Sequence, residues 1–229
     1  QTSGNCVRNV TADHLSGVAH DEIEDARPYA ELLRQYSTLH PEFLYLPRKF
    51  KFAVSGRASD GAATWLHDIG YRLVKDDEGR VKVKVLVGGG LGRTPVIAET
   101  IREQLDVGEL FSYTEAILRV YNLHGDRANK FKARIKILVR RLGIEAFKNE
   151  VEREHDRIKG GALTLTEARV DEMKAFFQEP PFSKDAPAGE AEVERLVQEN
   201  EAFARWLRRN TKPHKQPGYR VVWVSLKPK

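Results

Sequence analysis

The chain has 229 residues, of which 41% are hydrophobic and 31% charged, and 38 Lys and Arg against 33 Asp and Glu leave a net charge of +5. This composition is typical of a folded globular protein and excludes a disordered or fibrous chain. Cys6 is the only cysteine, which excludes an internal disulfide and a metal site built from several cysteines, and the lack of a long apolar run or signal peptide predicts a cytoplasmic protein with no membrane partner.

The first part of the chain is predicted to contain a short helix, a longer helix and three strands. Residues 1–26 are polar, so we expect a loop with a short helix there. Pro28 suits a first helical turn and His40-Pro41 would stop the helix that follows it. Runs of apolar and β-branched residues predict strands over 43–54, 66–74 and 81–87, the last two joined by a turn at Asp77-Glu78-Gly79.

The rest of the chain reads as mainly helical. Thr94-Pro95 fits an N-cap followed by a first-turn proline, so the next helix is expected to begin there. The apolar periodicity predicts helices over 95–105, 111–124, 129–142, 144–159, 165–178 and 190–209. Prolines and polar residues predict connectors over 184–189 and 211–218, and 219–226 resembles the start of a strand.

These elements predict an α+β fold in which helices cover a mixed or antiparallel sheet and a helical arm follows. We expect a compact body over 1–160, a helical connector over 161–216 and, over 217–229, the first strand of a further half-domain. Because the sequence begins at Gln1 and ends in a strand that has just started, we expect it to be a piece of a longer protein.

Positive charge is concentrated between residues 127 and 141. The helix predicted over 129–142 has an apolar stripe at helical spacing, and the rest of its surface is basic. A solvated surface is one interpretation, and a nucleic-acid backbone, an acidic protein or a polyanionic cofactor are the functional alternatives. The stripe consists of Phe131, Ile135, Leu138 and Leu142, and the basic residues are Arg127, Lys130, Lys132, Arg134, Lys136, Arg140 and Arg141.

A second basic cluster lies in the predicted strand over 43–54. Because side chains alternate along a strand, Phe50 and Phe52 would share one face, and Lys49 and Lys51 the other. Two neighbouring ammonium groups repel each other unless an anion lies between them, and the repulsion lowers their pKa and makes them better proton donors. Solvated lysines that protect a sheet edge are the alternative.

The remaining motifs are weaker. The glycine run 88–92 follows a strand, where backbone N–H groups can face an anion, but it matches neither the P-loop nor the dinucleotide fingerprint, and a tight turn is the alternative. Asp13, His14, His20 and Asp21 could ligate a metal, but a polar loop is the favoured interpretation, so we predict no metal site in this chain.

Four segments together resemble the sirohaem-containing sulfite and nitrite reductases. The most specific are Leu-Pro-Arg-Lys-Phe-Lys and the triple glycine, and within the family the chain is most similar to the bacterial sulfite reductase haemoprotein, or β-component. In chain order, the segments span 1–9, 45–51, 86–91 and 129–136.

The resemblance implies a central domain that holds part of a sirohaem pocket. It implies that Arg8, Lys49 and Lys51 bind the oxyanion, polarise it and pass protons to its departing oxygens. Sirohaem bears several carboxylates, so the basic residues would face the cofactor and not a nucleic acid. The implied cofactor-binding residues are Asn5, Arg48, Gly88, Gly89, Gly90, Arg93, Arg127, Arg134 and Lys136.

The resemblance also implies what this chain lacks. Family members bind a 4Fe-4S cluster through four cysteines, and Cys6 does not match that motif. The implied reaction is the six-electron reduction of sulfite, fed by ferredoxin or a flavoprotein, and we expect this chain alone to be inactive. Nitrite is the alternative substrate, and a basic nucleic-acid-binding module is the alternative of another class.

Overall fold

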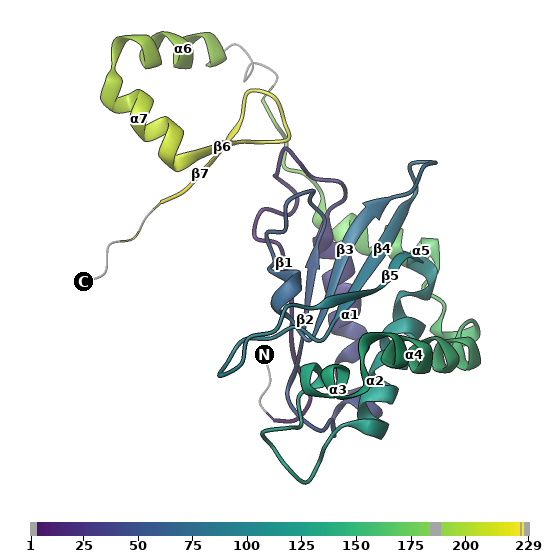
Figure 1. Cartoon of the computed structure of the whole chain (residues 1–229). Helices are drawn as coiled ribbons and strands as arrows, with labels where there is room; N and C mark the ends of the chain where they lie inside the picture. The colour runs from purple at the N-terminus through teal and green to yellow at the C-terminus, as the bar shows by residue number, and fades with distance from the viewer. Residues whose placement is uncertain (1–3, 184–188, 225, 227–229) are drawn as a thin grey trace.

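In the computed structural model, which describes residues 4–183, 189–224 and 226, a mixed sheet forms the centre of the body (Figure 1). Its five strands lie in sequence order, with β1–β2 and β2–β3 parallel and β3–β4 and β4–β5 antiparallel. The predicted α+β class with a mixed sheet is therefore confirmed. The strands are β1 Val7–Ala12, β2 Phe50–Ser55, β3 Ile69–Lys75, β4 Val81–Val87 and β5 Glu99–Asp106.

One face of the sheet carries the hydrophobic core. Phe52, Tyr71 and Val85 point to this face and are buried under the helices of the body. Helix α1 packs on β1 and β2, α3 on β4, and α4 on both β5 and α2. These helices are α1 Ala26–Ser37, α2 Leu110–His124, α3 Ile135–Leu142, α4 Ile144–Ile158 and α5 Glu167–Lys174.

The opposite face is covered at one end by loops. A short 3-10 helix, η2 Thr64–Leu66, contacts β2, β3 and β4 there. Further short 3-10 turns link the other elements of the body: η1 Pro41–Phe43, η3 Val107–Glu109, η4 Gly161–Leu163 and η5 Ala175–Phe177.

A small arm stands apart from the body at the C-terminal end (Figure 1). It consists of α6 Gly189–Glu199, α7 Glu201–Asn210 and the antiparallel pair β6 Thr211–Pro213 and β7 Arg220–Val222. Lys215 joins it to the body, because its N–H donates to the Val18 carbonyl at 3.0 Å and its ammonium pairs with Glu22 at 3.1 Å.

Two predicted elements have the wrong type. Residues 95–105 were expected to form a helix but contribute strand β5, in which Ile101 and Leu105 are buried while Glu103 between them is exposed, beside register shifts in the pairing with β4. That four-residue spacing imitates a helix. The predicted N-terminal loop contains β1, an edge strand whose six residues are all half-buried, so it lacks a clear alternating pattern.

Other predicted elements have the right type but the wrong limits. The strand expected over 43–54 starts at Phe50, and the helix expected over 129–142 starts at Ile135, which leaves Phe131 82% exposed and outside any apolar stripe. The helix expected over 190–209 is broken at Asn200, whose side chain accepts a hydrogen bond from the Phe203 N–H at 3.0 Å and caps α7.

The last predictions concern the C-terminal end. The connector expected over 211–218 contains β6, which pairs with β7, so the strand expected over 219–226 already has a partner here. Residues 184–188, 225 and 227–229, on which the connector and strand predictions partly fall, lie outside the described residues, as do residues 1–3 of the N-terminal motif.

Candidate functional site

Lys49 and Lys51 line one hollow of about 380 Å³ at the start of β2. Phe50 and Phe52, which alternate with them, are completely buried in the core, as the sequence predicts. Arg134, at the N-cap of α3, completes the positive lining of the hollow. Its remaining lining comes from Ala63, Leu66, His67, Asp68, Leu91 and Gly92.

The positive groups of this site act on one another. Burial lowers the pKa of the Lys49 ammonium, and the positive charges of Arg134, Arg8 and Lys51 lower it further, while Asp68 opposes the shift. Gathering like charges around the hollow therefore disfavours the protonated form of Lys49. A bound anion would relieve this repulsion, so the electrostatics favour an anionic guest.

Asp68 is a site residue that the sequence analysis missed. Its carboxylate is buried, and its Oδ1 accepts hydrogen bonds from Nη2 of Arg134 at 2.7 Å and from Nε at 3.2 Å. Its Oδ2 accepts the backbone N–H of Lys51 at 3.0 Å. The available signal was an aspartate directly before a buried strand, a position where a charge must find a partner.

The glycine loop packs against the same corner of the sheet. Gly88 donates its N–H to the Asp68 carbonyl at 3.0 Å, and Gly90 exchanges two backbone hydrogen bonds with Val96. A Cβ at Gly89 would lie 2.5 Å from the Trp65 carbonyl oxygen, so only glycine fits there. These contacts explain the glycines by close backbone approach.

The side chain of Lys136 binds the backbone of this loop. It is 6% exposed, and its ammonium donates to the carbonyls of Gly90 at 3.3 Å, Leu91 at 3.1 Å and Thr94 at 2.5 Å. Burial and the nearby Arg134 lower its pKa. The structure therefore engages Lys136 with the backbone of the loop and does not bring it into the hollow.

Arg8 approaches the site without lining its hollow. Val7 pairs with Phe50 and Asn9 with Lys51, so Arg8 is the extra residue of a bulge in β1. Its Nε donates to the Gly4 carbonyl at 2.9 Å, and the residue lines a neighbouring hollow beside α1.

The other predicted cofactor-binding residues do not line the hollow. Asn5 is exposed, and its carbonyl accepts the N–H of Leu46 at 2.8 Å. Arg127 is also exposed and donates to the Tyr45 carbonyl at 2.9 Å. Arg48, half-buried, directly precedes Lys49, and Arg93 is exposed on the 91–95 loop.

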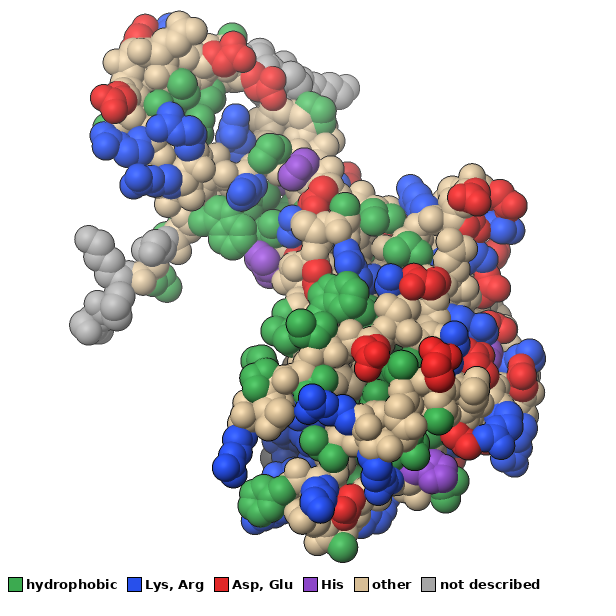
Figure 2. Space-filling view, viewed as in Figure 1, with side chains coloured by type: hydrophobic (Ala, Val, Ile, Leu, Met, Phe, Trp, Pro, Cys, Tyr) green, Lys and Arg blue, Asp and Glu red, His purple; other side chains and the backbone are tan. Residues whose placement is uncertain are grey.

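Lys and Arg side chains gather at the lower left of the body, over the loops that follow β4 and precede α3 (Figure 2). The predicted basic helix is only partly present, because its first half is a loop. Its basic residues therefore lie on two kinds of structure and form no single helical face.

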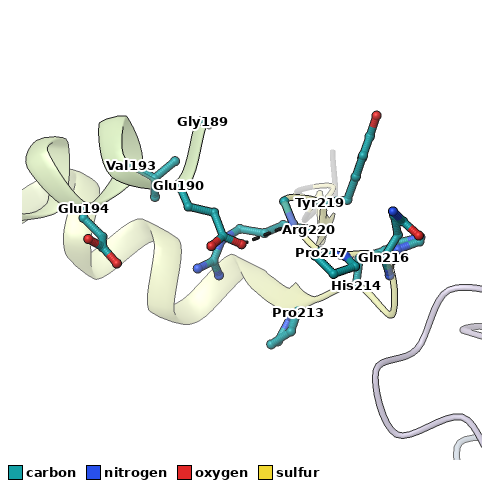
Figure 3. A pocket seen from close by; sticks show the side chains of 11 residues that line it. Gly189, Glu190, Val193, Glu194, Pro213, His214, Gln216, Pro217, Tyr219 and Arg220 are labelled. Carbon is teal, nitrogen blue, oxygen red and sulfur yellow. Dashed lines mark hydrogen bonds between the residues drawn. The ribbon is translucent and has the colours of Figure 1, made fainter. Parts of the chain in front are cut away.

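A separate hollow of about 350 Å³ lies in the arm (Figure 3). Val193 and Glu190 of α6 face the β6–β7 turn, where Oε1 of Glu190 accepts the Gly218 N–H at 3.1 Å. Tyr219 and Arg220 also line it. It contains none of the predicted site residues.

The residues considered for a metal do not form a site. Across the described part of the chain, no cluster of three or more His, Cys, Asp and Glu side chains could hold a metal ion. Asp13 and Asp21 instead face the guanidinium of Arg57, at 3.6 and 2.8 Å. Over the same residues, no helix is long and apolar enough to cross a membrane.

Comparison with known proteins matches the body of the chain to one family. The chain is 33% identical over 155 residues to a sulfite reductase (ferredoxin) 1 of Mycolicibacterium paratuberculosis, covering 68% of this chain and 28% of that protein. It is 32% identical over 162 residues to a chloroplastic ferredoxin–nitrite reductase of Arabidopsis thaliana, covering 69% of this chain and 27% of the relative.

A solved structure agrees with these relatives. The structure of the Mycobacterium tuberculosis NirA protein is 32% identical, superposes with a TM-score of 0.60 and covers 69% of this chain and 29% of that one. The chain thus spans under a third of the length of these relatives. Residues 3–159 match the family described as "Nitrite and sulphite reductase 4Fe-4S domain", and the chain belongs to that family.

Proposed function

We propose that the protein containing this chain reduces sulfite to sulfide and that this chain supplies the cationic side of the substrate site. The observation that carries the proposal is the hollow shared by Lys49, Lys51 and Arg134. It lies within the residues that match the reductase family. Sulfite is a small dianion, which three cations around a half-buried hollow can hold and orient.

The two lysines suit more than binding. An ammonium group with a lowered pKa gives up its proton more readily, and Lys49 is such a group. Reduction of an oxyanion removes oxygen as water, so protons must be delivered while negative charge develops. Lys49 and Lys51 would donate those protons, and Arg134 would stabilise the remaining charge.

The chain's residues also fit contact with sirohaem, a polyanionic macrocycle. Positive charge for its carboxylates would come from the half-buried Arg48 and Arg134 and from the exposed Arg93 and Arg127. Asn5, which is exposed and lies just before β1, would add a polar contact. Gly88, Gly89, Gly90 and Lys136 would shape the loop against it. When bound, sirohaem supplies the iron at which the substrate accepts electrons.

The 4Fe-4S cluster does not fit this chain by itself. Such a cluster requires four thiolates, and the sequence has one cysteine. The proposal therefore assigns the cluster ligands to other parts of the full-length protein, and predicts that this chain alone has no reductase activity. Ferredoxin or a flavoprotein subunit is the proposed electron donor, because relatives are named for ferredoxin or NADPH.

The test uses the full-length protein that contains this chain. We expect sulfite-dependent oxidation of reduced methyl viologen, and no turnover by the 229-residue chain. Lys49→Met and Lys51→Met should each lower kcat/KM for sulfite at least about tenfold. Lys84→Met is the matched control, since Lys84 lies in β4 and pairs with Glu103 outside the hollow. Equal activity in all variants would refute the proposal.

Nitrite is the second candidate substrate. The Arabidopsis thaliana relative is named a nitrite reductase, and the same cations suit either oxyanion. Measuring kcat/KM for sulfite and nitrite on one preparation separates the two, and a clear preference for nitrite would replace sulfite in the proposal.

A further inference from the structure

One buried carboxylate connects three segments around the candidate site. Asp68 binds Arg134 at the N-cap of α3 and the backbone of Lys51 in β2. Its own carbonyl accepts the Gly88 N–H of the glycine loop. The two residues that its side chain contacts are distant in the sequence: Lys51 is 17 positions from Asp68 and Arg134 is 66.

We propose that Asp68 is a positioning residue for the anion site, which holds the guanidinium of Arg134 and the strand of Lys51 in the geometry that a bound oxyanion requires. The proposal rests on the proposed function, because it concerns the same hollow. It assigns Asp68 no contact with the substrate.

The charges around the hollow show why a carboxylate is needed. Every other charged group that shifts the pKa of Lys49, namely Arg134, Arg8 and Lys51, is positive, and Asp68 alone opposes them. Without a negative partner, the positive lysines would repel the guanidinium of Arg134. Its side chain is 20% exposed, so it could turn toward solvent. Asp68 keeps it beside the lysines before any anion arrives, which is electrostatic preorganisation.

A simpler role for Asp68 gives the opposite expectation. If the carboxylate acted only as a negative charge, it would compete with the anionic guest, and neutralising it would strengthen anion binding. If it positions Arg134, neutralising it releases the guanidinium and weakens binding. The sign of the change in affinity therefore distinguishes the two roles.

The experiment compares Asp68→Asn with the unmodified 229-residue chain by NMR titration with sulfite. Asn keeps the size and one hydrogen-bond acceptor, so only the charge and the second strong acceptor are removed. We expect affinity to fall about tenfold. Asp76→Asn is the matched control, because Asp76 also pairs with an arginine, Arg80, but in the β3–β4 turn, and its affinity should not change. Equal or tighter binding by folded Asp68→Asn overturns the proposal.

A second readout does not depend on sulfite. The Nε–H of Arg134 should exchange slowly with solvent in the unmodified chain, quickly in Asp68→Asn, and slowly again in Lys49→Met. If the unmodified chain binds no sulfite, the proposed function fails for this chain, while the Arg134 signal still decides the role of Asp68. A slow signal in Asp68→Asn would refute that role.

Arg134→Gln covers the case in which Asp68→Asn does not fold. It breaks the same pair from its more exposed side, where the side chain is 20% exposed against 2% for Asp68. We expect the same loss of affinity. Where Asp68→Asn does fold, combining the two changes should cause no further loss, because the two residues act as one unit. Unchanged affinity in Arg134→Gln would contradict the proposal.

Discussion

At the scale of single residues, the charged side chain of Lys49 lowers the stability of the fold. Its pKa is lowered by burial and by three positive neighbours, so folding disfavours its charged form. Lys49→Met should therefore raise the free energy of unfolding at pH 7, by up to about 1 kcal/mol, while weakening anion binding. Urea unfolding of the 229-residue chain measures the change.

The pH dependence of that change has a defined sign. A lysine whose folded pKa is depressed destabilises the fold while it is charged in both states. The penalty disappears as the pH rises through the folded value and up to the unfolded value. The stability difference between Lys49→Met and the unmodified chain should thus shrink in alkali. Lys75→Met, at the exposed end of β3, serves as the control and should show no such trend.

Sequence patterns could identify the lysines but not their partners. Alternation around Phe50 and Phe52 is a local signal and correctly separates the core face from the face of Lys49 and Lys51. Asp68 and Arg134 meet across 66 positions, a contact that depends on how α3 docks on β4. No pattern within a short window contains that contact, and the resemblance carried only the arginine.

At the scale of elements, the glycine loop depends on close backbone contact. A Cβ at Gly89 would lie 2.5 Å from the carbonyl oxygen of Trp65 and 2.6 Å from that of His67, and neither backbone atom can move easily. Gly89→Ala should lower the free energy of unfolding by about 2–4 kcal/mol. Thermal unfolding of the chain measures this loss.

Gly108 provides the matched control for that change. A Cβ there would meet only the Leu165 carbonyl oxygen, at an ordinary 3.5 Å. Gly108→Ala should change stability by less than about 1 kcal/mol. If both variants lose stability equally, the close approach at Gly89 does not explain the glycine.

The N-terminal loop is held by an ion pair with a clear pH signature. Burial alone would raise the pKa of Asp21, but hydrogen bonds from Ser59 and Arg57 outweigh it and hold that pKa well below its usual range. The stabilisation is therefore complete above the unfolded value near 3.9 and is lost as the pH falls further. Asp21→Asn should cost about 1–3 kcal/mol at pH 7.

The same comparison at low pH tests the mechanism. As the pH falls below about 4, the unmodified chain should lose this contribution and the difference from Asp21→Asn should narrow. Unfolding curves at several pH values measure the difference. A gap that stays constant down to pH 2 would show that the charge of Asp21 is not responsible.

The elements that sequence patterns misjudged share a physical cause. Strand β5 imitates a helix because Ile101 and Leu105 are buried while Glu103 between them is exposed, so the burial repeats every four residues where the pairing with β4 is irregular. Strand β1 carries no alternation because it lies at an edge and pairs in parallel with β2, from which a long stretch of sequence separates it. In both cases the deciding interactions come from a neighbouring strand.

At the scale of the whole molecule, the division of the chain into a body, a connector and a further strand remains a prediction. The residues that join the hydrophobic core bear on where the body ends. We proposed a body over 1–160, a connector over 161–216 and a strand of a further half-domain over 217–229. Leu165, Val170 and Met173, which follow residue 160, are 3–6% exposed and join the core cluster of the body. Helix α5 also packs on α1, where Lys174 pairs with Glu24.

Two truncations should therefore behave differently. A chain ending at residue 178 keeps α5 and loses the arm, whose links to the body centre on Lys215, and should unfold within a few degrees of the full chain. A chain ending at residue 160 exposes the surface that three buried side chains cover. We expect this to lower the free energy of unfolding by roughly 4–8 kcal/mol. That loss is comparable to the whole stability of a typical domain, so the shorter chain should be largely unfolded at 25 °C. Circular dichroism melts of both chains measure this, and equal melting would place the boundary of the body at residue 160.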